Sequence, residues 1–192
     1  MSLIILDRQH RGRASKPKDA GAAFKGYVEA DLVERYIAVA TQELKRLGHR
    51  VEVLLSGEYG SRHVEAIALA KASKERCLYV ACHVNAGGGR YALVEHDSRS
   101  KGGAAAAAIV AREFALRLAP EVNTGKVVAL GSADRGFACI DGIYAGPANL
   151  SAVLFEPGFI DSSQHAGLWT TAGLSRIGVA LAAGCDAWGR AA

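Results

Sequence analysis

The chain alternates between two hydrophobic periods, and this alternation constrains its fold more than any other feature. Short apolar runs of strand length and composition occur at about 2–6, 51–55, 77–82, 91–95, 126–130 and 152–156. Helical patterns separate or follow them, at about 27–47, 61–74, 103–118 and 170–189. Alternating strands and helices are typical of a mostly parallel sheet, because each helix carries the chain back to the same edge. We therefore predict an α/β fold, a three-layer sandwich whose twisted, mostly parallel sheet carries helices on both faces.

The length and composition favour a single domain. The chain has 192 residues, half of them are hydrophobic, and no stretch has the composition of an interdomain linker. We expect one catalytic domain over residues 1–192. No stretch approaches the ~20 apolar residues of a membrane span. The N-terminal residues lack the basic region of a secretion signal, so we expect synthesis in a cytoplasm and no membrane anchor.

The charge and the cysteines exclude two further classes of protein. The net charge is only +4, and no aromatic residues interleave with the basic ones, so we do not expect a nucleic-acid partner. A mild positive charge suits an anionic polymer such as a bacterial cell wall. The cysteines form no C-x-x-C pair and have apolar neighbours, so we predict buried, reduced thiols: Cys77, Cys82, Cys139 and Cys185. The sequence indicates no oligomeric state.

Chemically active side chains follow three of the predicted strands. His10 follows the first strand, His83 follows the third, and Glu156 ends the last. In open parallel sheets, functional residues gather beyond the carboxyl ends of the strands. We therefore expect both histidines and this carboxylate at one edge of the sheet. Cys82 precedes His83 but points to the opposite face of its strand, so we do not expect its thiol to share a site with the His83 side chain.

Glu29 lies on the apolar face of the first long helix. At ~100° per residue it shares that face with Leu32, Val33 and Tyr36. A carboxylate on a buried face is costly unless a charge or a donor compensates it. One interpretation is that Glu29 caps its own helix, where negative charge is favoured. The other is that it binds a metal.

The two histidines favour the metal. Together His10, Glu29 and His83 offer two imidazoles and one carboxylate, a recurrent set of zinc ligands that leaves a fourth position open. Glu156 would then act as a general base on water. Two other histidines are weaker candidates. His49 follows a Leu-Gly helix stop and is predicted to be solvated, and His165 is either a surface residue or within reach of the site.

At these residues the chain resembles the zinc-dependent N-acetylmuramoyl-L-alanine amidases of the Amidase_3 type. A strand and its turn read Ile4-Ile5-Leu6-Asp7-Arg8-Gln9-His10-Arg11-Gly12, where the family has D-x-G-H-G-G. A glutamate, Glu29, starts the first long helix. The family's H-x-N-A motif is intact as His83-Val84-Asn85-Ala86, and its E-x-G-F motif is Glu156-Pro157-Gly158-Phe159. The motifs occur in order and cover nearly the whole chain.

The resemblance implies an activity and a set of roles. His10, Glu29 and His83 would bind Zn²⁺, and Glu156 would be the catalytic acid/base. The reaction would be hydrolysis of the amide bond between N-acetylmuramic acid and L-alanine, with peptidoglycan as the partner. Such an enzyme without a signal sequence looks like a phage endolysin that reaches the wall after release, or like a domain of a secreted bacterial protein.

Some residues depart from the family pattern or carry further hypotheses. Gln9 and Arg11 stand where the family has glycines, which affects the geometry of the turn. The asparagine that often follows the last motif is absent, and Asp161-Ser162-Ser163 stand in its place. Asn85 is a candidate for orienting a ligand or the substrate. Arg90, after the glycine loop at 87–89, is a candidate for binding a stem-peptide carboxylate, although a mobile solvated loop is an equal alternative.

Two other classes of function remain open. The chain is alternatively a different zinc amide hydrolase, such as a peptidase, or a wall-binding module with a degenerate site. Glu156 discriminates between an enzyme and a binding module. An amidase and a peptidase both need this carboxylate, whereas a binding module does not.

Overall fold

The computed structural model describes residues 1–122 and 124–191. Six strands form the central sheet in the order β4-β1-β5-β8-β6-β7. Their bounds are β1 (Leu3–Arg8), β4 (Arg50–Leu54), β5 (Cys77–Cys82), β6 (Ala92–Asp97), β7 (Gly125–Leu130) and β8 (Leu150–Glu156). A separate two-stranded hairpin pairs β2 (Ala23–Phe24) with β3 (Tyr27–Val28). The predicted strands are confirmed, with boundaries that shift by at most two residues.

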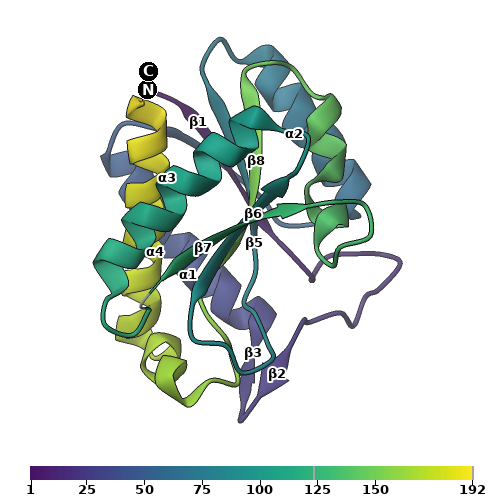
Figure 1. Ribbon diagram of the computed structural model, residues 1–192. Coiled ribbons are helices and arrows are strands. Elements are labelled where there is room, and N and C mark those ends of the chain that lie inside the picture. The colour runs from purple at the N-terminus through teal and green to yellow at the C-terminus, as the bar shows by residue number, and fades with distance from the viewer. Residues whose placement is uncertain (123, 192) are drawn as a thin grey trace.

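The helices cover both faces of this sheet (Figure 1). Their bounds are α1 (Glu29–Arg46), α2 (Tyr59–Ala72), α3 (Lys101–Leu118) and α4 (Thr171–Arg190). Helix α4 packs between α1 and α3 on one face. On the other face lie α2 and the short 3₁₀ turns η1 (Phe137–Cys139) and η2 (Asp141–Ala145). A third 3₁₀ segment, η3 (Ser163–Trp169), precedes α4. The predicted three-layer α/β sandwich is confirmed.

The sheet is parallel except at one pair. Strands β4, β1, β5 and β8 run in one direction, whereas β6 is antiparallel to β8 and parallel to β7. The carboxyl ends of β1, β5 and β8 therefore meet at one edge. Because β6 runs the other way, its first residues lie beside the end of β8. This reversal places β6 side chains near the candidate site.

Two apolar cores hold the layers together. Along β1, Ile4 and Leu6 pack toward α1, α3 and α4, while Leu3 and Ile5 pack toward α2. Both sets are fully buried, as expected for a central strand covered on both faces. The four cysteines are buried and free, which confirms the predicted reduced thiols. Among the described residues, no helix is both long enough and apolar enough to span a membrane.

His49 is buried, so the prediction that it is solvated is wrong. Its side chain is buried, and its Nε2 lies 2.9 Å from Asp186 Oδ1 of α4. The local sequence around His49 ends a helix, but the packing of α4 onto that end covers the ring. This burial results from a contact between residues 137 positions apart, so local sequence signals do not contain it.

Candidate metal centre and active site

The turn that carries His10 has an unusual backbone. His10 has a φ of 68°, in the left-handed region that residues other than glycine rarely adopt. Its neighbours Gln9 and Arg11 are the two residues that replace family glycines. A turn without these glycines needs other interactions to hold it, and the structure contains them.

Arg62 of α2 contacts this turn through several hydrogen bonds and one ion pair. The side chain is fully buried, and its guanidinium forms an ion pair with Asp7 at 2.6 Å. The same group donates to the carbonyl oxygens of Arg8 and Arg11, which lie on either side of His10. Its Nε donates to Gly57 O at 2.8 Å. The planar guanidinium group of Arg62 thus fixes the backbone on both sides of His10 through hydrogen bonds to its carbonyl groups.

Asp7 and Gln9 complete this buried network. Asp7 accepts hydrogen bonds from the Gln9 amide nitrogen and the Tyr79 hydroxyl, in addition to the ion pair with Arg62. Burial raises the pKa of Asp7, even though Arg62 and Tyr79 act in the opposite direction. The Gln9 side chain is fully buried. The residue that replaces a glycine is therefore packed into the network.

Glu29 points toward the sheet from the first turn of α1. Its Oε1 lies 3.0 Å from His10 Nε2 and 3.0 Å from His83 Nδ1, and it accepts from the Val84 backbone at 2.9 Å. Its Oε2 accepts from the Ala22 backbone at 2.8 Å. None of these donors belongs to the first turn of α1, in which Glu29 is one of two acidic residues. The Glu29 carboxylate therefore makes no capping hydrogen bond to its own helix, and its contacts favour the second interpretation, a metal ligand.

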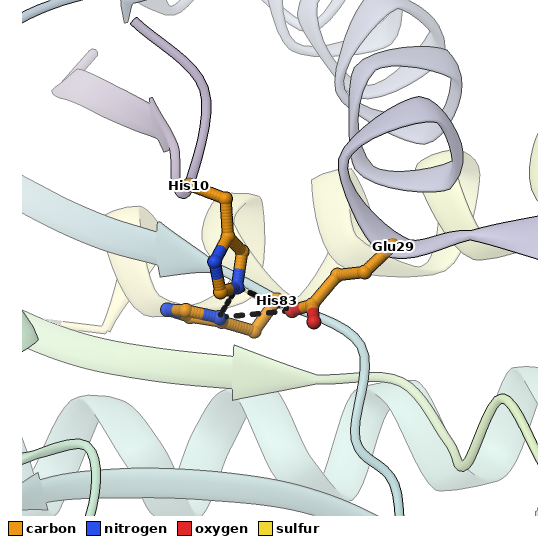
Figure 2. A group of neighbouring side chains, drawn as sticks. All are labelled: His10, Glu29 and His83. Atoms are coloured by element: carbon orange, nitrogen blue, oxygen red, sulfur yellow. Dashed lines mark hydrogen bonds and ion pairs between the residues drawn. The ribbon is translucent and has the colours of Figure 1, made fainter. Parts of the chain in front are cut away.

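Three potential ligand atoms converge at this point (Figure 2). His10 Nε2 and His83 Nδ1 lie 3.2 Å apart, and Glu29 Oε1 is 3.0 Å from each. The ligand atoms of a tetrahedral zinc site with bonds of ~2.1 Å are about 3.4 Å apart. The other ring nitrogen of His10 lies 3.0 Å from Asp19 Oδ1, a carboxylate–histidine contact typical of metal ligands. The donor types and the spacing fit a zinc ion.

The carboxylate and the imidazoles of this cluster stabilise each other's charged forms. Burial alone would raise the pKa of Glu29, but hydrogen bonds from His10 and His83 outweigh it and hold that pKa well below its usual range. Burial alone would lower the pKa of His10, but Glu29 and Asp19 outweigh it and raise that pKa. The carboxylate is thus ionised in a buried place.

Glu156 lies in the same cleft at the end of β8. The cleft has a volume of about 800 Å³, and its lining includes His10, Glu29, His83 and Glu156. Burial raises the pKa of Glu156 to about 8, with further increases from the negative charges of Glu95 and Glu29. A carboxyl group with a pKa near neutral is suited to accept and return a proton.

Asn85 contacts Glu156 directly, because its side-chain nitrogen donates to Glu156 Oε2. Its backbone also bridges to the segment after β8: Asn85 N donates to Gly158 O at 2.9 Å, and Ile160 N donates to Asn85 O at 2.8 Å. The intact H-x-N-A motif therefore aligns with the E-x-G-F motif through this asparagine. Its predicted orienting role fits these contacts.

The glycine loop is hydrogen-bonded to Asp161, and Arg90 does not line the cleft. The Asp161 carboxylate accepts from the backbone of Gly87 at 2.9 Å and of Gly88 at 3.0 Å, which fastens a loop expected to be mobile. Arg90 is exposed and is not part of the described lining of the cleft, whereas Arg135 is. Substrate contact by Arg90 stays a prediction.

His165 is neither a surface residue nor part of the cleft lining. It is fully buried, and its Nδ1 accepts from Phe159 N at 2.9 Å. A side chain at Gly158 would collide with its ring. His165 therefore supports the turn after Glu156.

Sequence reasoning missed four residues of this region, Asp19, Arg62, Glu95 and Arg135. The local pattern does not distinguish Asp19, Arg62 and Arg135 from ordinary surface residues, and only the tertiary fold reveals their contacts. Glu95 did carry a signal, because it is an acid within an apolar strand run. The same reasoning that identified Glu29 applies to it.

Comparisons with known proteins agree on the fold. No family model and no curated protein matches the sequence. Among solved structures, the chain is similar to the amidase Ami1 from Mycobacterium smegmatis, with 18% identity, a TM-score of 0.76, and coverage of 97% of this chain and 96% of Ami1. It is similar to the CwlD amidase from Clostridioides difficile, solved with the GerS lipoprotein, with 17% identity, a TM-score of 0.75 and 98% coverage of both chains.

A longer protein also contains this fold. Cwp6 from Clostridium difficile matches with 19% identity and a TM-score of 0.74, over 96% of this chain. This chain spans only 29% of Cwp6. The chain described here has the fold of the N-acetylmuramoyl-L-alanine amidases.

Proposed function

We propose that this chain is a zinc-dependent N-acetylmuramoyl-L-alanine amidase, and that residues 1–192 form its catalytic domain. Its substrate is peptidoglycan, and the bond cleaved joins N-acetylmuramic acid to L-alanine. The observation that carries the proposal is the convergence of His10, Glu29 and His83 in one cleft with Glu156. The amidase fold of its structural neighbours supports the same activity.

The proposed roles follow from the positions of the side chains. His10 Nε2, Glu29 Oε1 and His83 Nδ1 hold the zinc, which when bound supplies Lewis-acid activation of a carbonyl group and of water. Arg62 and Asp19 fix His10, and the Val84 and Ala22 backbone donors fix Glu29. These contacts pre-orient the ligands before the ion arrives.

Glu156 moves the proton. It takes a proton from the attacking water as the water's oxygen adds to the lactyl carbonyl carbon of muramic acid. It then gives a proton to the amide nitrogen as the C–N bond breaks, which releases the amino group of L-alanine. Asn85 keeps the carboxylate in a fixed orientation through its side-chain hydrogen bond. Proton transfer of this kind is typically worth 10²–10⁴-fold in rate.

Two measurements test the proposal. Purified protein should contain about one zinc per chain, and it should clear a suspension of purified cell wall unless a chelator is present. Mass analysis of the fragments should show intact glycan and peptides that begin with L-alanine. Fragments cut inside the peptide would instead indicate a peptidase, and wall binding without cleavage would indicate a binding module.

A further inference from the structure

Glu95 is an acid in an unusual place. It lies inside strand β6, only 8% of its surface is exposed, and within the described residues its carboxylate has no hydrogen-bond or ion-pair partner. Other buried acids are paired: Asp7 with Arg62, Glu29 with two histidines, and Asp97 with Arg99. The carboxylate oxygens of Glu95 are not among the fully buried unpaired atoms of the described residues, because they face the cleft. A hydrogen-bond donor of a molecule in the cleft can therefore reach them, and a hydrogen bond to a charged, largely desolvated carboxylate is stronger than one between neutral groups.

The sheet register aims Glu95 into the cleft. In the antiparallel β6–β8 pair, Leu93 lies opposite Glu156, and Glu95 lies opposite Leu154. Opposite residues point to the same face, so Glu95 and Glu156 are diagonal neighbours on one face, about 7–8 Å apart at their Cα atoms. All four side chains line the cleft.

The surroundings of Glu95 leave its carboxylate open on the cleft side. Gly136 passes close to it, such that a side chain at Gly136 would come within 3.4 Å of Glu95 Oε2. Burial raises the pKa of Glu95 to about 7, and the negative charge of Asp134 adds to this effect. The carboxylate therefore sits in a place where a hydrogen-bond donor would stabilise its charged form.

The order of the strands shows on which side of Glu156 the side chain of Glu95 lies. The strand order β1-β5-β8-β6 places His10 and His83 on one side of Glu156 and Glu95 on the other. In the proposed reaction, the scissile carbonyl lies at the histidines and the leaving nitrogen lies at Glu156. The peptide beyond that nitrogen then extends toward β6.

We propose that Glu95 is a substrate-binding residue that accepts hydrogen bonds from backbone N–H groups of the stem peptide, on the leaving side of the scissile bond. This inference rests on the proposed amidase function for the direction of the substrate. It assigns Glu95 to peptide recognition, whereas Glu156 carries the chemistry.

The kinetic test compares two substrates that differ only in the length of the peptide. Zinc-loaded wild type, Glu95→Gln and the control Glu65→Gln, an exposed glutamate of α2 outside the cleft lining, are assayed on a muramoyl tripeptide and on muramoyl-L-alanine. Glu95→Gln should raise KM for the tripeptide about tenfold with little change in kcat, because a hydrogen bond to a charged group is lost. The shorter substrate should show no difference, and Glu65→Gln should resemble wild type on both. An equal effect of Glu95→Gln on both substrates, or no effect on either, would overturn the proposal.

A binding measurement separates this inference from the proposed activity. The free tripeptide that the reaction releases is titrated by calorimetry into wild type and Glu95→Gln, with thermal unfolding as the check that both are folded. Weaker binding by about tenfold supports the role of Glu95, and equal binding contradicts it. If wild type binds the tripeptide through Glu95 but cleaves no wall, the amidase proposal fails and the peptide site stands.

Discussion

The two halves of the cleft shift the pKa of buried glutamates in opposite directions. In the ligand half, made of His10, Glu29 and His83, the glutamate is paired with two imidazoles and its pKa is lowered. In the carboxylate half, made of Glu95 and Glu156, burial raises the pKa of Glu95 to about 7 and that of Glu156 to about 8, with smaller contributions from the negative charges of Asp134 on Glu95 and of Glu95 and Glu29 on Glu156. Glu29 and Glu95 are almost equally buried, with 4% and 8% exposed. Burial acts on both glutamates, so the difference between their pKa values comes from the imidazoles that are hydrogen-bonded to Glu29 and have no counterpart at Glu95.

The largest expected effect comes from the carboxylate half. Glu156→Gln keeps the size of the side chain and removes its ability to take a proton from water. We expect turnover on a muramoyl peptide to fall by about 10²–10⁴-fold. The measurement is kcat on zinc-loaded protein, with thermal unfolding to verify the fold. Turnover within tenfold of wild type would show that another group moves the proton.

The next effect concerns the support beneath the ligand half. Arg62→Met removes the only cation paired with buried Asp7 among the described residues, and breaking such a pair costs about 3–5 kcal/mol. Urea unfolding of the metal-free proteins measures this loss. The matched control is Arg35→Met, an exposed arginine of α1 with one side-chain hydrogen bond, to Thr171, which should cost about 1 kcal/mol or less. Equal losses at the two positions would mean that the Arg62 network does not hold the turn.

A smaller effect should appear in the pH dependence of stability. Burial in the folded chain raises the pKa of Glu156 from its ordinary value of 4.5 to about 8, so folding favours its protonated form. Its stabilising contribution is full below pH 4.5 and is lost as the pH rises through 8. Glu156→Gln avoids that loss. Metal-free Glu156→Gln should therefore gain about 1–3 kcal/mol over wild type between pH 5 and pH 8, measured by urea unfolding. A stability difference that does not change with pH would contradict the raised pKa.

The smallest effect is expected at Cys82, which precedes His83 on β5. Its side chain packs into the core formed with α1, α3 and α4, on the face opposite the carboxylate half. Cys82→Ala should retain zinc and most activity and should lose only about 1 kcal/mol of stability. Zinc analysis and turnover check this. Loss of zinc with the fold intact would mean that the thiol belongs to the ligand set.

Sequence reasoning located the ligand half because its signals are local. The ends of two parallel strands identify His10 and His83, and the apolar face of a helix identifies Glu29. The fold was predictable for the same reason, because strand and helix periods repeat along the chain.

The carboxylate half was predictable only in part. Glu156 was identified because it ends a strand. Glu95 reaches the cleft because β6 runs antiparallel to β8, and the hydrophobic pattern of a strand does not indicate its direction in the sheet. Arg62 and His49 were missed or misjudged because their partners lie more than 50 positions away along the chain. Tertiary packing, not local pattern, determines their burial.

The most direct test of the division between the two halves is the zinc content of Glu29→Gln and Glu156→Gln, measured side by side by elemental analysis. Glu156→Gln should retain about one zinc per chain. Glu29→Gln should lose most of its zinc and some thermal stability, because metal binding contributes to folding. The opposite pattern, with zinc lost from Glu156→Gln and retained in Glu29→Gln, would show that the cation and proton roles assigned to these two carboxylates are reversed.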